Sequence, residues 1–303
     1  MTELDKRSTR IGYASAILCA VLVGSISTAS KPVLANSSPL IYASLVYLLA
    51  SLSSIPLGYK AKNFKVQKKD WPILLAITLS GAVIAPILFF IGLKQTTASD
   101  TAILSNAETI FTVLIALIFF KERLRPLGYL AIGLVLIGIV IVTTNLQFTN
   151  ILSDLKKEGN LLIILAMAFW GLDNNLSKIV THRINISKIV QLKGAIGGSI
   201  VLIFAIITGS SINIPLIQIP NLLLVGMVGF GVSLYLFLHG LRRIGTVKTV
   251  LIYSTGTIFG LSFASIFLHE TVGAYQVGAI ALMLSGIYII TKEGQSVEKL
   301  DGK

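Results

Sequence analysis

The sequence predicts an all-α integral membrane protein with ten transmembrane helices, arranged as two inverted five-helix repeats. Composition, the spacing of charged residues and an internal repeat predict this fold. Charged residues make up 13% of the 303 residues, about half the fraction of a soluble domain, and the mean hydropathy is +0.85. A single cysteine, Cys19, excludes an intrachain disulfide and a cysteine metal cluster. We expect no metal and no cofactor.

Charged residues divide the chain into apolar segments of the length that a helix needs to cross a bilayer, roughly 20 residues. Pro86 lies inside the third segment, where we expect it to kink the helix and free backbone groups toward a cavity. The ten expected spans are residues 11–31, 37–58, 71–93, 97–119, 126–144, 160–181, 187–208, 220–241, 246–268 and 273–291.

The distribution of Lys and Arg predicts that both termini are cytoplasmic. With this orientation every inner segment is basic, whereas the outer segments hold only Lys94, Lys156 and Lys157. The net charge of +12 is therefore spread over short loops that face anionic lipid, and it does not indicate nucleic-acid binding. We expect a multi-pass protein of the plasma membrane.

The second half of the chain repeats the first. Residues 92–144 align without a gap on residues 240–292. We therefore expect a first repeat over residues 1–145, an extracytoplasmic linker over 146–159 and a second repeat over 160–303. Five spans is an odd number, so the second copy enters the membrane from the opposite side. Matched residues include Gly12/Gly159, Gly24/Gly171, Lys31/Lys178, Gly92/Gly240, Thr109-Ile110-Phe111/Thr257-Ile258-Phe259, Glu122/Glu270 and Gly138/Gly286.

Inverted repeats are typical of secondary transporters, whose substrate site lies where the two repeats meet. We predict a secondary transporter of small polar metabolites, such as amino acids or amines, that works by alternating access, with export as the favoured direction. The alternatives are an uncoupled facilitator or exchanger and, less favoured, a membrane enzyme or receptor. The chain has neither a phosphate-binding loop nor a His-Glu-x-x-His zinc motif, so we do not expect an enzyme. Expected partners are a small-molecule substrate, the lipid bilayer and coupling protons, for a monomer or homodimer.

Two short motifs resemble those of the EamA branch of the drug/metabolite transporter superfamily. Trp170-Gly171, followed by Lys178, resembles the pattern in the opening span of a repeat. The segment from Thr109 to Leu124, which ends in Phe-Lys-Glu-Arg-Leu, resembles the signature of the fourth span. Val23 departs from this pattern, as the family often has Trp there. The resemblance covers the whole chain and implies a ten-span transporter of small metabolites, amino acids prominent among them.

Carboxylates inside the expected spans are candidate functional groups, because a charge at the bilayer centre costs at least about 2.5–3.5 kcal/mol. Asp173 lies halfway through the sixth span and Glu108 within the fourth. Their equivalents in the other repeat, Ile26 and Gly256, are uncharged. We expect both carboxylates to bind a substrate ammonium or to carry a coupling proton. The alternative is that Asp173 pairs with Lys178 or with a neighbouring span and serves packing.

The remaining candidates are polar and aromatic residues of a cavity between spans 1, 3, 4, 6, 8 and 9. Lys178 could neutralise a substrate carboxylate or extend to the membrane interface, where we also expect Lys31 and Lys193 to reach. Glu122 and Glu270, which end their spans at equivalent places, are expected to cap or pair. The complete expected substrate site is Asn106, Glu108, Trp170, Asp173, Asn174, Lys178, Tyr235 and Tyr253.

Overall fold

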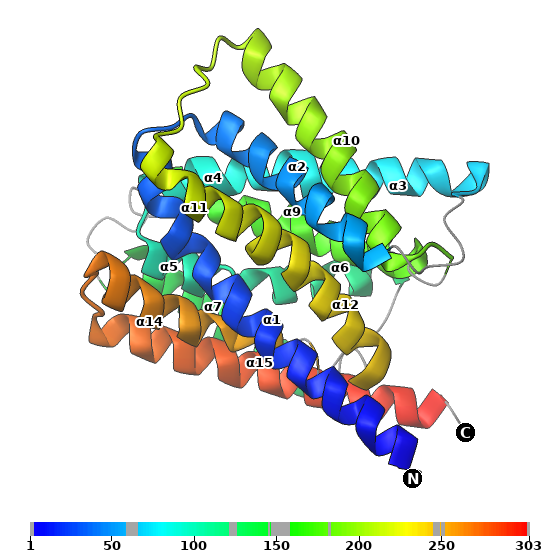
Figure 1. Ribbon diagram of the computed structural model, residues 1–303. Helices are drawn as coiled ribbons and strands as arrows, with labels where there is room; N and C mark the ends of the chain where they lie inside the picture. Colours follow the sequence, from blue (N-terminus) through cyan, green and yellow to red (C-terminus); the bar gives the residue numbers. More distant parts are fainter. Residues whose placement is uncertain are drawn as a thin grey trace.

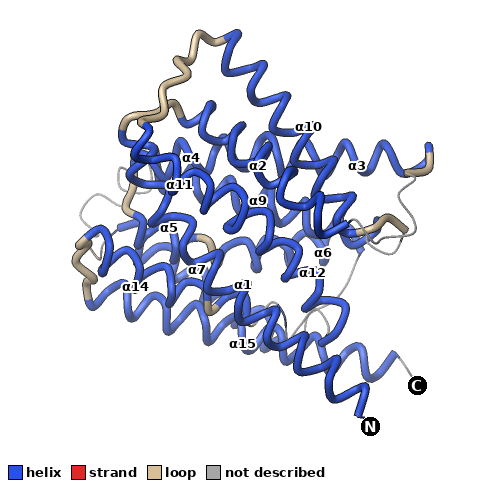
Figure 2. Tube along the Cα trace, in the orientation of Figure 1, coloured by secondary structure: helices blue, strands red, loops and turns tan. Residues whose placement is uncertain are grey.

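The computed structural model describes residues 3–58, 66–120, 126–144, 146, 158–180, 183–244, 249 and 252–301. These residues are helical almost throughout, and Figure 2 shows no strand among them. The first half contains α1 (Glu3–Ala35), α2 (Pro39–Gly58), α3 (Trp71–Thr78), α4 (Ala85–Gln95), α5 (Ala98–Leu104), α6 (Ala107–Phe120) and α7 (Pro126–Thr144). The second half contains α9 (Glu158–Val180), α10 (Ile186–Ile207), α11 (Ile219–Leu223), α12 (Ser233–Ile244), α14 (Gly256–Leu268) and α15 (Ala274–Asp301).

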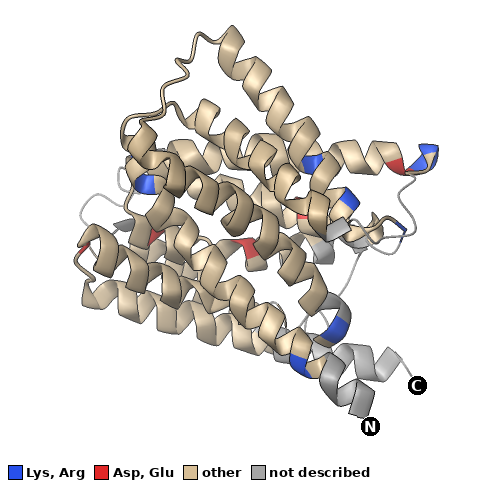
Figure 3. Ribbon diagram, viewed as in Figure 1, with Lys and Arg blue, Asp and Glu red and all other residues tan. Residues whose placement is uncertain are grey.

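Several helices have the length and composition of membrane spans. In the described part of the chain, five segments qualify by both criteria: Thr9–Ala35, Pro39–Pro56, Lys68–Gln95, Ile186–Ile207 and Leu216–Gly240. Figure 3 shows that the coloured charged residues lie mostly at helix ends, while the lengths of the helices are largely uncharged. The start of α1 and the end of α15 lie at the same end of the bundle (Figure 1). The protein is an all-helical membrane protein; the exact number of ten spans stays a prediction.

Equivalent helices of the two halves pack against each other in opposite directions. Ser37, just before α2, donates a hydrogen bond of 2.9 Å to the carbonyl of Asn213, beyond the end of α10. Ser51, late in α2, donates one of 2.9 Å to the carbonyl of Gln191, early in α10. The two helices are therefore antiparallel, as Figure 1 shows. The helices α7 and α15 form a second such pair.

Glycines that match in sequence make matching contacts in space. Gly24 of α1 lies against Phe259 of α14, and Gly171 of α9 lies against Phe111 of α6. A Cβ at either glycine would come within 2.8 or 2.9 Å of the facing phenylalanine Cβ, so both helix pairs need a glycine at the crossing. Phe111 and Phe259 are themselves equivalent. The helix packing therefore follows the inverted repeat that the sequence indicates. The boundaries of the repeats stay predictions, and residues 147–157 of the expected linker lie outside the described residues.

Helix irregularities also occur at equivalent places. Wide, π-helical turns join α3 to α4 at Leu79–Ile84 and α11 to α12 at Leu224–Val232. A turn at residues 105–106 separates α5 from α6, and a turn at Thr255 interrupts the counterpart helix just before α14. Irregular backbone at membrane depth is tolerated where protein or a cavity satisfies its polar groups. These four interruptions mark the part of the bundle in which a site can form.

Pro86 explains one of these interruptions. The N–H of Ala85 bonds to the carbonyl of Ser80, five residues earlier, which is the π-helical pattern. The next bond in that pattern would join residue 86 to the carbonyl of Gly81, but proline has no N–H. The Gly81 carbonyl is thus left to accept hydrogen bonds from side chains. The prediction that Pro86 frees backbone groups is confirmed.

Candidate functional site

A cavity of about 150 Å³ lies between the two halves. Among the described residues, those of α1, α2, α4, α5, α6, α9, α10, α12 and α14 line it, and none of α7 or α15 does. The spans predicted to form the cavity do so, and α2 and α10 add to them. An apolar cavity of about this size in another protein accommodates benzene. The space therefore suits a ligand of roughly six non-hydrogen atoms.

Most of the predicted site residues line this cavity. Tyr235 does not: its ring packs on that of His239, with the centroids 4.4 Å apart, and other residues of α12 form the wall. Lys178 belongs to α9, but its side chain lies outside the described residues. The predicted residues in the cavity wall are Asn106, Glu108, Trp170, Asp173, Asn174 and Tyr253.

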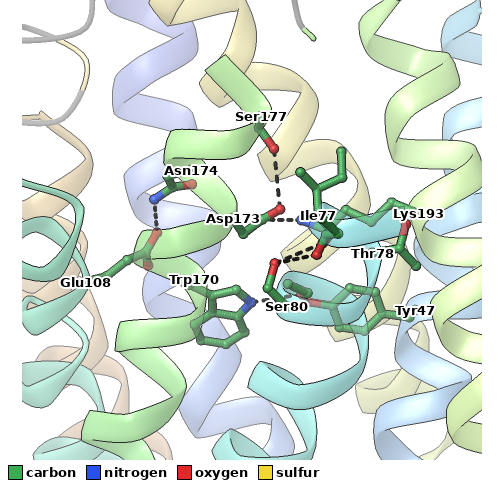
Figure 4. Close-up of polar contacts among 12 residues, drawn as sticks. Tyr47, Ile77, Thr78, Ser80, Glu108, Trp170, Asp173, Asn174, Ser177 and Lys193 are labelled. Atoms are coloured by element: carbon green, nitrogen blue, oxygen red, sulfur yellow. Dashed lines mark hydrogen bonds and ion pairs between the residues drawn. The ribbon is translucent and has the colours of Figure 1, made fainter. Parts of the chain in front are cut away.

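Glu108, near the start of α6, is held by neutral polar side chains. The Asn174 side-chain amide donates a hydrogen bond of 2.7 Å to Oε1, and the Tyr253 hydroxyl donates one of 3.4 Å to Oε2. Figure 4 shows Asn174 of α9 pointing toward Glu108. Among the described side chains none forms an ion pair with this carboxylate. Glu108 thus presents a carboxyl group to the cavity, and no cation among the described side chains pairs with it.

Asp173 has a different environment, because it forms a buried ion pair with Lys193 of α10. Both side chains are 8% exposed, and Ser177 donates a hydrogen bond of 3.3 Å to the other carboxylate oxygen. Figure 4 shows the ammonium and the carboxylate facing each other. Gly81 makes room for the pair, since a Cβ there would overlap both side-chain ends.

This pairing corrects the expectation for Lys193 and identifies a partner of Asp173. Lys193 does not extend to the membrane interface, because its ammonium is neutralised inside the bundle. Of the partners left open for Asp173, the structure shows one on a neighbouring span. The available signal was a lysine well inside the seventh span and an aspartate halfway through the sixth, as intramembrane charges commonly pair. Sequence periodicity on either helix alone does not reveal such a partner.

Trp170 forms an aromatic part of the wall, with its indole fixed in place. Its ring N–H donates a hydrogen bond of 3.0 Å to the freed Gly81 carbonyl, which also accepts one of 2.6 Å from the Tyr47 hydroxyl. The indole packs against Phe89 and Phe230, at centroid separations of 5.1 and 6.1 Å. Tyr47, on α2, is a wall residue that sequence reasoning missed. The aromatic groups give the polar site an apolar side.

Asn106 lies at the turn between α5 and α6 and is 4% exposed. Its side-chain oxygen, Oδ1, accepts a hydrogen bond of 2.9 Å from the hydroxyl of Thr257, which lies at the interrupted helix of the other half. Its amide nitrogen has no hydrogen-bond partner among the described residues. Buried polar atoms are nearly always paired, so a donor left open in a cavity wall suits a ligand acceptor.

Two charged residues outside the cavity cap helix ends. Glu270 accepts hydrogen bonds of 2.9 Å from the backbone N–H groups of Ala98 and Ser99, at the start of α5, where a negative charge is favourable. The predicted capping role of Glu270 is thereby confirmed, while its counterpart Glu122 lies outside the described residues. Lys31, expected only to reach the interface, bonds to backbone carbonyls at the end of α4, including that of Leu93 at 2.8 Å.

Relatives of this chain are named as transporters. A protein of Methanothermobacter thermautotrophicus, named an uncharacterized transporter, is 30% identical over 298 residues, which cover 94% of this chain and 87% of that protein. A Synechocystis protein of the same description is 24% identical and covers 90% of this chain and 88% of its own length. One crystal structure shares the fold, with a TM-score of 0.68 at 16% identity, over 97% of this chain and 99% of the other.

The match to a family model follows the two repeats. The model of the EamA-like transporter family matches residues 10–144 and again residues 157–292. These two ranges correspond closely to the two halves of the structure. Equivalent helices of the halves pack in opposite directions, and both halves line the cavity. The chain belongs to the EamA-like transporter family.

Proposed function

We propose that this protein is a secondary transporter that moves small amines or amino acids across the plasma membrane by alternating access, in the direction of export. The observation that carries this proposal is a cavity to which both repeats contribute equivalent positions. Phe89 and Phe237 both line it, and so do Thr109 and Thr257. A site on the axis between two inverted halves can face either side of the membrane when the halves exchange conformations.

The chemistry of the wall supports a ligand with an ammonium group. Glu108 offers a carboxylate without a resident ion pair among the described side chains, and Asn174 and Tyr253 hold it in place. The open amide of Asn106 suits a hydrogen-bond acceptor on the same ligand, such as a carboxylate or hydroxyl oxygen. Rings such as that of Trp170 suit a short apolar part.

Glu108 is also the group that we propose for coupling to protons. Intramembrane carboxylates that face a cavity commonly mark proton relays. A proton and a substrate ammonium would compete for this carboxylate, so the inward movement of one could drive the outward movement of the other. Asp173, the second coupling candidate from the sequence, is already paired with Lys193 and is the weaker one.

The test is flux of labelled n-butylamine, and of a panel of labelled amino acids, in proteoliposomes with and without an imposed pH gradient. Accumulation of a compound that depends on both the gradient and the protein supports coupled transport. Equilibration without accumulation, at a rate above that in protein-free liposomes, would identify an uncoupled facilitator. Flux no greater than in protein-free liposomes for every amine and amino acid would overturn the proposed substrate class. Loss of label from preloaded cells that express the protein tests export.

A further inference from the structure

The charge of the cavity wall is set by three side chains. Among the described residues that line it, the charged ones are Glu108, Asp173 and Lys193. Lys193 neutralises Asp173, whereas the side chains that bond to Glu108 are neutral. With all three groups ionised, the wall carries one net negative charge, although it contains two carboxylates.

One short segment of α9 links the two carboxylates, Asp173 and Glu108. Asp173 and Asn174 are consecutive residues of α9, and Asn174 is the side chain that bonds to Glu108 at 2.7 Å. One short segment of α9 thus holds one carboxylate itself and fixes the other through a hydrogen bond. A small ligand with two ammonium groups could approach both if Asp173 were free.

Lys193 is held in its place by the packing of α10. One residue further along, Gly194 lies directly on α2, where a Cβ would come within 2.6 Å of the Tyr47 carbonyl oxygen. Gly198, one turn later, also contacts α2, where a Cβ would lie 2.9 Å from the carbonyl oxygen of Ser44. Because the backbone is fixed on one side and Gly81 gives room on the other, the ammonium stays on Asp173. Ion pairs buried in this way are costly to break, since separation leaves an uncompensated charge.

We propose that Lys193 is a specificity-determining residue: it serves as a built-in cation that occupies Asp173, so that the site accepts ligands with one ammonium group and discriminates against those with two. This inference rests on the proposed function, because it assumes that the cavity is the transport site. A monoamine neutralises the remaining charge on Glu108. A diamine brings a second positive charge, but Asp173 is already paired with Lys193. The second ammonium would therefore lie near the ammonium of Lys193, and like charges placed together in a binding site oppose binding.

The test uses a monoamine and a diamine with the same carbon chain, n-butylamine and 1,4-diaminobutane, both about the size of the cavity. Lys193→Gln should raise the ratio of diamine to monoamine uptake at least about tenfold, because it frees Asp173 for the second ammonium. Lys188→Gln is the matched control: it lies on the same helix, outside the cavity wall, and should leave the ratio unchanged. A folded Lys193→Gln variant with an unchanged ratio would overturn the inference.

A second pair of variants decides the matter if Lys193→Gln does not fold. Asp173→Asn leaves the ammonium of Lys193 unpaired in the wall and should lower monoamine uptake sharply. The double variant Asp173→Asn/Lys193→Gln restores one net negative charge and should recover monoamine uptake relative to Asp173→Asn. Equal uptake by the single and double variants would contradict a role for charge balance. If the unmodified protein moves neither amine, the inference about Lys193 fails. The proposed function fails only if the protein also moves none of the amino acids, so the two failures are distinguishable.

Discussion

The two walls of the cavity are equivalent by position and different in chemistry. On one side, α9 presents Trp170, Asp173 and Asn174; on the other, α1 presents Val23 and Ile26 at the positions equivalent to the first two. The contacts that hold the helices together follow the inverted repeat, as the crossings at Gly24 and Gly171 do. The symmetry is therefore kept at the helix crossings and lost in the side chains that line the cavity.

The largest expected effect comes from removing the charge on the polar wall. Glu108→Gln should reduce gradient-driven accumulation of amine to the level of protein-free liposomes. The substitution removes the carboxylate to which we propose that a proton or a substrate ammonium binds. The fold should survive, because the glutamine oxygen can still accept the hydrogen bond from Asn174 while its amide nitrogen donates to the hydroxyl oxygen of Tyr253. Uptake in proteoliposomes measures the effect, and size-exclusion chromatography in detergent checks the fold. Normal gradient-driven accumulation by this variant would show that coupling lies elsewhere.

The next effect comes from placing a charge on the apolar wall. Ile26→Asp introduces the carboxylate that the first repeat lacks. At the place in α2 that is equivalent to Lys193, the residues are apolar, so no lysine can pair with the new carboxylate. The unpaired charge should destabilise the protein by about 2.5–3.5 kcal/mol. Thermal unfolding in detergent should show a lower Tm than for Ile26→Asn, the matched neutral control. Equal Tm values for the two variants would mean that this wall tolerates charge as well as the other does.

The fold could be predicted from the sequence to a larger extent than the site could. Matched glycines helped to identify the repeat, and the structure places Gly24 and Gly171 at equivalent helix crossings, where a Cβ would not fit in either copy. The placement of Tyr235 was wrong for a local reason: the π-helical turn at Leu224–Val232 changes the angular position of every later residue of that span, so regular helical spacing fails there. A partner for Asp173 on a neighbouring span was left open, but Lys193 was not identified as that partner, because pairing joins two helices whereas periodicity describes one.

A smaller effect concerns the turns that interrupt the two central helices. Asn106 has an equivalent, Ser254, in the other half, and both line the cavity. Asn106→Ser makes the two positions identical and removes the open amide donor. Loss of one ligand hydrogen bond, about 1 kcal/mol, should raise the KM for a transported amino acid about fivefold. An unchanged KM in this variant would show that the amide does not contact the ligand.

The smallest expected effects separate two tyrosines that sequence reasoning treated alike. Tyr253 donates a weak, 3.4 Å hydrogen bond to Glu108, so Tyr253→Phe should lower amine affinity only about two- to threefold. Tyr235 lies outside the cavity wall and packs on His239, so Tyr235→Phe should leave uptake unchanged. Both substitutions remove one hydroxyl from an aromatic ring, so each controls for the other. Uptake measured over a range of amine concentrations distinguishes them, and a larger loss at Tyr235 than at Tyr253 would mean that α12 turns a different face toward the ligand during transport.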